Sequence, residues 1–457
     1  MNLRPLSFVV SHPAARPRRS RQRDSLRGIY ATAWILVSSL CALHGFCQAQ
    51  QARISLCNEG IGQFASKFST GVTVTVGAQK VSGFASHACS AALTWGKSEL
   101  PVTAGAAEVD IDVMGADLGL GKPVVAFQIR SAAADAQMSY QVYSLEQPPR
   151  LLRAVTGGDF YSAADTDLDS RIEIWTGDAL AADGLEGLPI TGFDFPPTVV
   201  LRFEKDRLMD VSAEFAPDYD RQIAKVRALL SAQALSDFKN SDALPMGRSS
   251  LPSGRQLKLL ATKIKVLEIV LDYLYSGRDQ DAWAALAAMW PAPDVDRIRS
   301  ALLAAQARGI RKQVDGVATP VPGPRHQNAA YVYDLVHVWT PMAGSMGSGA
   351  VRGRGRFSYP AAEDPSPSRG VLKPAPIFML TPEISGGKQN FPATGLSLEL
   401  TVDAAGKVRT AKMVNAVHKG PIVDSLLGAT SAWKFIPATK DHHPVACNFR
   451  LSVSPAR

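Results

Sequence analysis

The sequence lacks the motifs that mark several large classes of enzymes. It contains no G-x-S-x-G, the turn that presents the nucleophile of many serine hydrolases. The nearest segment, Gly344 to Gly349 (GSMGSG), has the wrong spacing. The zinc motif H-E-x-x-H and a glycine-rich phosphate loop are also missing. We therefore expect a protein that is not an enzyme. A secreted enzyme with an unrecognised active site in a β-rich domain is the alternative.

Basic charge is scarce outside the N-terminus. The formal net charge is +8 over 457 residues, but before residue 50 seven arginines face a single acidic residue, Asp24. That segment holds +6, which leaves about +2 for the rest of the chain. A nearly neutral body lacks the basic surface that binding to phosphates requires. Nucleic acid is therefore excluded as a partner.

The arginine-rich start leads into an apolar run. Residues Ile29 to Phe46 (IYATAWILVSSLCALHGF) are apolar apart from small hydroxyl side chains and His44. Cys47 and Ala49 then supply the small residues that precede a cut after Ala49. This is the order of a secretory signal peptide, which we predict over residues 1–49 of a periplasmic or secreted protein. If the segment is not cleaved, it is an inner-membrane anchor and the chain faces the periplasm.

Few cysteines remain after such a cut. They are Cys57, Cys89 and Cys447. Export permits a disulfide, and the first two lie in one β-rich segment, so we predict a Cys57–Cys89 bridge. Two buried free thiols are the alternative. Cys447 is expected to be a buried strand residue.

Length and periodicity predict a multidomain α+β protein. With 46 % hydrophobic and 20 % charged residues, the 457-residue chain is ordinary for two or three globular domains. Residues 50–215 alternate in short runs such as GVTVTV (71–76), VVAFQI (124–129) and TVVLRF (198–203). Turn residues separate these runs, which is typical of a β-rich domain, either a sandwich or propeller-like.

The period becomes helical over residues 216–312. Ile223, Val226, Leu229 and Leu230 share one helix face, and a second helix is expected to stop at Ser276-Gly277. Asp279 is expected to cap the next helix. Residues 274–291 (LYSGRDQDAWAALAAMWP) resemble the second half of a tetratricopeptide repeat, with a plain helical hairpin as the alternative.

Residues 313–373 have the composition of a linker. They are rich in glycine, proline and serine and show no sustained period. One segment differs, Tyr331 to Trp339 (YVYDLVHVW), which we expect to form a strand that docks elsewhere.

The last segment, residues 374–457, reads as a small α/β domain. Leu396 to Val402 (LSLELTV) alternates as a strand, and a turn through Gly406 leads into a second strand from Val408. Pro421 to Lys434 reads as an amphipathic helix, and a final strand is expected over Val445 to Val453.

This order resembles the TonB C-terminal family. The resemblance rests on residues 400–408 (LTVDAAGKV), the W-x-F-x-P-A element at 433–438 (WKFIPA) and Pro444-Val445. It implies a helix closed over a small antiparallel sheet by two aromatic side chains and a proline. The family motif falls on Asp403, Gly406, Val408, Trp433, Phe435, Pro437 and Ala438.

An acidic segment is the best candidate for an ion site. Residues 165–173 (DTDLDSRIE) place three carboxylates at alternate positions, as calcium loops do. The segment also resembles the aspartate loops of FG-GAP-type β-propeller repeats. The expected Ca²⁺ ligands are Asp165, Asp167, Asp169, the Arg171 carbonyl and Glu173. A solvated acidic turn is the alternative.

Together these features predict a non-enzymatic protein of the cell envelope. Its TonB-like C-terminal domain is expected to bind an envelope protein, by adding a strand to an exposed sheet edge. A membrane-anchored energy transducer for transport across the outer membrane is the alternative if residues 1–49 stay in the membrane.

Overall fold

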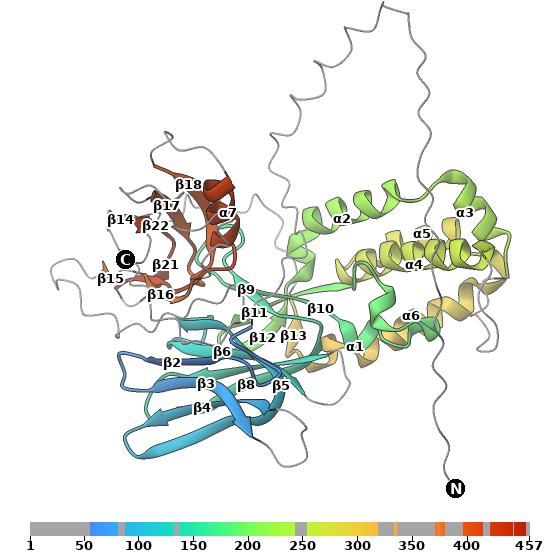
Figure 1. Ribbon diagram of the computed structural model, residues 1–457. Coiled ribbons are helices and arrows are strands. Elements are labelled where there is room, and N and C mark those ends of the chain that lie inside the picture. The colour runs from blue at the N-terminus through green and yellow to red at the C-terminus, as the bar shows by residue number, and fades with distance from the viewer. Residues whose placement is uncertain are drawn as a thin grey trace, which may run out of the picture. The chain divides into compact units, whose positions relative to one another are not determined.

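The structure is a computed structural model of the chain (Figure 1). It describes residues 55–80, 87–131, 137–242, 254–318, 333–335, 371–372, 374–379, 396–414, 421–441 and 443–453. The predicted signal peptide lies outside these residues. Within them the fold is mixed α+β with several antiparallel sheets and seven α-helices, which confirms the α+β part of the prediction. No helix in the described part of the chain is long and apolar enough to cross a bilayer.

The first sheet is an antiparallel meander. Its strands are β1 (Cys57–Asn58), β2 (Gln63–Lys67), β3 (Thr73–Lys80), β4 (His87–Trp95), β5 (Ser98–Ala116), β6 (Val124–Ser131), β7 (Met138–Ser144) and β8 (Leu151–Gly158). Strands β2 to β8 lie side by side in chain order, and β1 pairs with β5. In β3, Val74 and Val76 are buried while Thr73 and Thr75 are half-buried, as the alternation in the sequence predicts.

Both faces of the first sheet are covered. Along β6, Val124 and Ala126 belong to one core cluster, whereas Val125 and Phe127 belong to another. The first cluster includes the second sheet and the helices, and the second includes Ile377 from near the C-terminus. Strand β6 is therefore an almost continuous apolar run, as strands buried on both faces are.

The second sheet has the order β13-β12-β11-β10-β9. Its strands are β9 (Ser162–Ala164), β10 (Glu173–Gly177), β11 (Thr198–Glu204), β12 (Arg207–Asp210) and β13 (Gly316–Val317). The short helix α1 (Ala179–Ala182) follows β10. Strand β13 follows the helices in sequence and returns to pair with β12 in parallel, so sheet and helices form one core.

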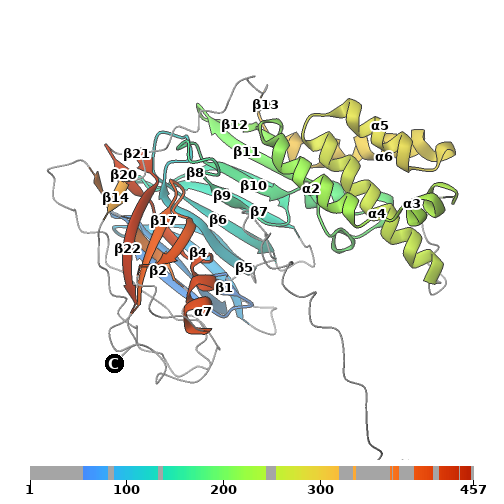
Figure 2. The same cartoon turned by 90° about the horizontal axis from the view of Figure 1, so that it is seen from above.

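Five longer helices lie between β12 and β13, on the green to yellow side of Figures 1 and 2. They are α2 (Ala216–Ala228), α3 (Ala232–Lys239), α4 (Gly254–Tyr275), α5 (Asp279–Met289) and α6 (Val295–Arg308). Helix α4 stops where expected, since Gly277 takes the left-handed φ of +75°. Helices α4 and α5 are joined by a short turn and pack against each other, so they form an antiparallel helical hairpin.

Two details of the helical prediction are wrong. Leu229 is 60 % exposed because α2 ends at Ala228, so Leu229 lies beyond the buried face. Asp279 is the first residue of α5, and Arg278 takes the N-cap position without a side-chain capping bond.

The C-terminal segment, defined here as residues 374–453, holds β16 (Ala375–Phe378), β17 (Leu396–Val402), β18 (Val408–Met413), α7 (Pro421–Thr430), β19 (Lys434–Ile436), β20 (Ala438–Lys440), β21 (His443–Val445) and β22 (Cys447–Val453). Strands β14 (Tyr333–Leu335) and β15 (Val371–Leu372) precede it. The C-terminal sheet is ordered β14-β22-β17-β18, so the strand expected near residues 331–339 exists and pairs with β22 in parallel. The helix is shorter than predicted because Lys434 already belongs to β19.

The predicted disulfide is present. Cys57 and Cys89 are bonded, with their Cα atoms 5.8 Å apart, and join β1 to β4 within a buried cluster. Cys447 is a buried free thiol on β22, as expected, and burial raises its pKa to about 12.

Reduction of this disulfide is expected to destabilise the first sheet. The bridge closes a loop across a sequence separation of 32 residues, for which chain entropy gives about 3–4 kcal/mol. Thermal unfolding with and without a reductant measures the effect. The variant Cys447→Ser should respond to the reductant as wild type does, since its thiol is not bonded. An unchanged melting temperature of wild type under reduction contradicts the expectation.

Candidate functional site

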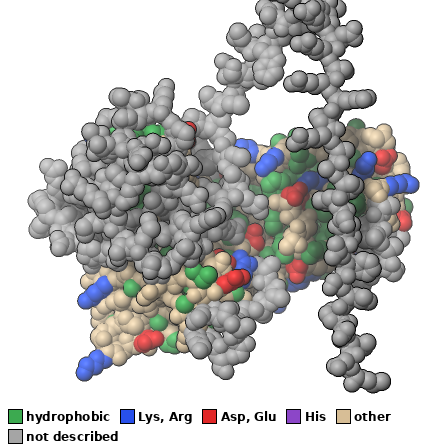
Figure 3. Space-filling model, in the orientation of Figure 1, with side chains coloured by type: hydrophobic (Ala, Val, Ile, Leu, Met, Phe, Trp, Pro, Cys, Tyr) green, Lys and Arg blue, Asp and Glu red, His purple; other side chains and the backbone are tan. Residues whose placement is uncertain are grey.

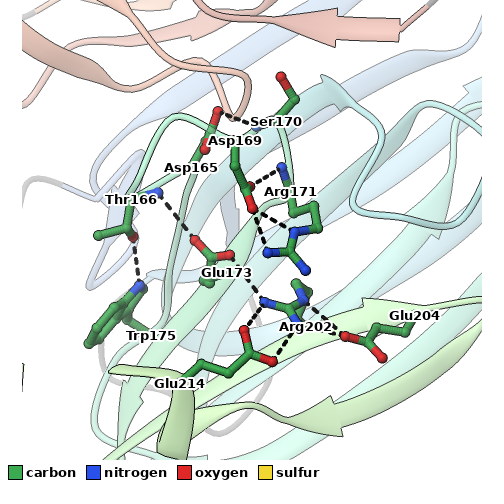
Figure 4. A network of polar contacts seen from close by, with 10 residues as sticks. All are labelled: Asp165, Thr166, Asp169, Ser170, Arg171, Glu173, Trp175, Arg202, Glu204 and Glu214. Atoms are coloured by element: carbon green, nitrogen blue, oxygen red, sulfur yellow. Dashed lines mark hydrogen bonds and ion pairs between the residues drawn. The ribbon is translucent and has the colours of Figure 1, made fainter. Parts of the chain in front are cut away.

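The acidic loop, residues 165–173, connects β9 to β10. Leu168 and Ser170 take positive φ angles of 60° and 68° and fold the loop tightly without the glycine usual in such turns. The Ser170 backbone N–H donates to Asp165 Oδ2 at 3.1 Å, which closes the loop over its first carboxylate (Figure 4).

The loop brings its three aspartates together. One carboxylate oxygen from each of Asp165, Asp167 and Asp169 lies within 4.8 Å of the other two. Oxygens this close together can share one Ca²⁺ ion, whose bonds to oxygen are about 2.4 Å long. Asp165 is fully buried, and its Oδ1 has no hydrogen-bond partner within the described residues. A buried carboxylate oxygen without a partner is costly, and a cation would satisfy it.

The side chains of Arg171, whose carbonyl is the predicted ligand, and of Glu173 contact other charged groups. The Arg171 guanidinium contacts Asp169, with Nε 2.6 Å from Oδ2. The Asp169 carboxylate therefore both faces the other two aspartates and pairs with Arg171. Glu173 is fully buried on β10, where its Oε2 accepts the Thr166 N–H at 3.2 Å and its Oε1 lies 3.7 Å from Arg202. The group of converging oxygens therefore comprises the three aspartates, with Glu173 directed at Arg202.

Arg202 balances the charge beneath the loop. Its side chain is 3 % exposed and forms ion pairs with Glu204 at 2.6 Å and Glu214 at 2.8 Å, in addition to Glu173 (Figure 4). Burial nevertheless raises the pKa of Glu173 to about 8. The pKa of Asp165 rises to about 7, first through burial and then through the charge of Asp403.

Asp403 belongs to a distant part of the chain. It begins the hairpin turn, residues 403–407, between β17 and β18, and it is fully buried. Its Oδ1 accepts the N–H groups of Ala405 and Lys407 at 3.0 and 2.9 Å, and its Oδ2 accepts the N–H of Asp165 at 3.2 Å. Burial raises the pKa of Asp403 to about 6. The hairpin turn of the C-terminal sheet thus sits directly against the acidic loop.

Two lysines fix the C-terminal segment to β5. Lys407 Nζ lies 2.5 Å from Asp112 Oδ1 and donates to the Asp112 carbonyl at 2.7 Å. Lys434 Nζ lies 2.5 Å from Asp110 Oδ2 and donates to the Ile111 carbonyl at 2.7 Å. Apolar contacts accompany them, since Ile377 is part of the core under the first sheet.

The remaining motif residues hold the C-terminal segment together. Trp433 and Phe435 are 2 % and 1 % exposed and pack in one cluster with β17 and α7. Gly406 has φ +82°, and a Cβ there would lie 1.8 Å from the Phe435 carbonyl oxygen, so only glycine fits. The Phe435 N–H donates to the Gly406 carbonyl at 2.8 Å. Among the other motif residues, Val408 begins β18, Pro437 is buried between β19 and β20, and Ala438 is the buried first residue of β20.

Comparison with known proteins does not add to this description of the site. No protein-family model, curated protein or solved structure matches this chain. The function has to be inferred from the chemistry of the site and from the exposed edges of the fold.

Local sequence patterns predicted some of these site residues and not others. The three aspartates and the motif residues were predicted as candidates. The contact between Asp165 and Asp403 spans 238 residues, and the one between Asp112 and Lys407 spans 295. Asp110, Asp112 and Lys434 carry no local signal, since single charged residues on a strand or at a helix end are common.

Proposed function

We propose that this chain is a non-enzymatic protein of the cell envelope whose TonB-like C-terminal domain binds a protein partner by strand addition at β18. The observation that carries the proposal is the order of the C-terminal sheet. Within the residues that the structure describes, β18 is the last strand of that sheet and has no neighbour on its outer side. An edge strand of this kind presents a row of backbone N–H and C=O groups to an extended peptide.

The opposite edge of the sheet supports this choice. There β22 pairs in parallel with β14, which comes from the segment before the C-terminal segment, with Tyr333 opposite Cys447. A short strand from elsewhere in the chain is thus accepted at an edge of this sheet. Because β14 already pairs with β22, a partner strand is directed to β18.

Strand β18 has the surface of a binding edge. Thr410 and Lys412 are exposed, whereas Val408, Ala411 and Met413 pack toward the helix side of the sheet. The lysine is one of the charges by which isolated edges avoid pairing with copies of themselves. Lys412 already pairs with Glu399 of β17 at 2.6 Å, and an acidic residue opposite it on a partner strand would add a second cross-strand pair of opposite charge, which would stabilise the sheet further.

The rest of the chain supports an envelope location. A signal-like N-terminus and a disulfide fit an exported protein. On the face in Figure 3, basic and acidic side chains are interspersed without a patch of one sign, as expected for a body that does not bind nucleic acid. In this proposal the β-rich domain, a sandwich or propeller-like unit, and the helical subdomain carry the C-terminal domain, and the acidic loop holds Ca²⁺.

A photoreactive amino acid at Lys412 tests the proposal in living cells. We expect one dominant adduct, containing a single envelope polypeptide, because a bound strand places a side chain about 5 Å away across the edge. The matched control is the same amino acid at Lys97, an exposed lysine in the turn between β4 and β5. Equal adducts from both positions, or none from Lys412, would contradict strand addition.

The mass of the N-terminus separates the two forms of this function. A chain beginning at Gln50 in the soluble envelope fraction identifies a secreted adaptor. A full-length chain in the membrane fraction identifies the anchored energy transducer, whose partner is then sought among outer-membrane receptors.

A further inference from the structure

The backbone of the acidic loop contacts one side chain of the hairpin turn and one side chain of β18. The Asp165 N–H donates to Asp403 Oδ2 at 3.2 Å, and Arg409 Nη2 donates to the Thr166 carbonyl at 3.2 Å. Ala404 and Ala405 of the turn belong to the same core cluster as the second sheet and the helices. The conformation of the loop and the docking of the C-terminal segment are therefore in physical contact.

This contact places two carboxylates together away from water. Asp165 and Asp403 are both fully buried. The charge of Asp403 is compensated by three backbone N–H groups and by neighbouring basic residues, Lys407 and Arg409. Asp165 receives one N–H, from Ser170, while its other oxygen has no hydrogen bond within the described residues. The uncompensated charge at the contact is therefore on Asp165.

Packing of the hairpin turn against the acidic loop makes the negative charge of Asp165 less favourable. When the turn leaves, Asp165 is separated from Asp403 and gains contact with water. When the turn returns, the Asp165 and Asp403 carboxylates lie close together away from water, where their negative charges repel each other. With a divalent cation bound to the loop, docking of the turn becomes favourable instead. Burial and the nearby Asp403 carboxylate then strengthen the attraction between the cation and the site.

We propose that a divalent cation bound by Asp165, Asp167 and Asp169 holds the hairpin turn against the acidic loop and so controls docking of the C-terminal segment. The ion is expected to be Ca²⁺, since the three side-chain ligands are carboxylate oxygens from one short loop, and Ca²⁺ accepts such hard ligands in flexible geometry. Mg²⁺ demands bonds of about 2.1 Å in an octahedron and should act more weakly. By thermodynamic linkage, docking strengthens cation binding by the factor with which the cation strengthens docking.

The inference stands apart from strand addition at β18. The contact of Lys434, which lies outside the turn on β19, with Asp110 on β5 keeps the C-terminal segment near the first sheet, so loss of the ion loosens the turn without releasing the whole segment. What changes is the exposure of the turn and of the β17–β18 hairpin that carries the binding edge.

Hydrogen exchange on the mature, disulfide-intact chain tests the coupling. Peptides covering the loop and the turn are followed at neutral pH in excess EDTA, in millimolar Ca²⁺ and in millimolar Mg²⁺. We expect Ca²⁺ to slow exchange of the Asp165 and Lys407 amides about tenfold or more, with a smaller effect of Mg²⁺. That factor corresponds to about 1.4 kcal/mol of coupling, within the usual range.

Two substitutions in the loop should act in opposite directions. Asp167→Asn removes a cation ligand but keeps the Asp165 charge, so exchange should be fast with or without Ca²⁺. Asp165→Asn removes the uncompensated charge and keeps an oxygen for the Ser170 N–H, so exchange should be slow with or without Ca²⁺. Glu99→Gln, an exposed carboxylate on β5, should respond as wild type does.

Calorimetry separates the ways in which the inference can fail. Heat of Ca²⁺ binding without any change in exchange refutes the coupling and leaves an isolated ion site. No heat at millimolar Ca²⁺, with Asp167→Asn and wild type alike in exchange, refutes the site itself. Neither result affects the photocrosslinking test at Lys412.

Discussion

Replacing Lys407 by methionine is expected to lower the free energy of unfolding by about 3–5 kcal/mol and to detach the hairpin turn from β5. The Asp112 side chain is 2 % exposed and accepts hydrogen bonds from Tyr140 Oη and the Ala163 N–H, both at 2.8 Å, besides Lys407 at 2.5 Å. Removing the lysine leaves a buried carboxylate without its counter-charge, which costs more than the pair itself contributes.

Denaturant unfolding followed by tryptophan fluorescence measures this loss. Lys412→Met is the matched control, because the Lys412 side chain is 72 % exposed and its pair with Glu399 on β17 is a surface ion pair. Its unfolding free energy should stay within about 1 kcal/mol of wild type. Adding Asp112→Asn to Lys407→Met should restore much of the loss, since the unpaired charge is then gone. If Lys407→Met and Lys412→Met behave alike, the docking contact does not exist in solution.

Replacing Phe435 by alanine is expected to destabilise the C-terminal segment by about 3–5 kcal/mol. The ring is 1 % exposed and packs with Trp433, Leu398 and Leu426, so its removal leaves a cavity between β17 and α7. The backbone of the same residue bonds to Gly406, which couples the cavity to the hairpin turn. The loss should therefore reach the β17–β18 hairpin as well.

Limited proteolysis and denaturant unfolding together locate this effect. We expect early cleavage within residues 396–453, while the disulfide-linked first sheet stays resistant. Phe435→Leu keeps most of the apolar volume and should cost under about 1.5 kcal/mol. Cleavage that begins instead in the helices α2 to α6 would show that Phe435 supports a different part of the molecule.

Local patterns in the sequence were sufficient for the C-terminal strands. Leu396 to Val402 alternates strictly between buried and half-buried positions, and both ends of β17 match the prediction. The sequence also predicted the acidic loop, because aspartates at alternate positions in a short turn can bring their carboxylates together. Glu173, which the pattern also predicted as a ligand, has a cationic partner in Arg202, 29 residues further along the chain.

Contacts between distant segments could not be derived in this way. Nothing near Asp112 distinguishes it from an exposed strand aspartate until Lys407 is placed beside it. The same holds for Asp403, which the motif marked as a turn residue and the fold brings to the acidic loop. Helix α7 ends early because Lys434 pairs with Lys407 across a β-bridge, a tertiary contact that overrides helical periodicity.

The most direct test of partner binding is hydrogen exchange of β18 with the polypeptide captured through Lys412. An added strand protects the outward-facing amides, which are alternate residues of Val408–Met413, and leaves β14 and β22 unchanged. That result would establish strand addition at this edge. Protection of helices α2 to α6 instead, with β18 exchanging as in the free protein, would contradict it.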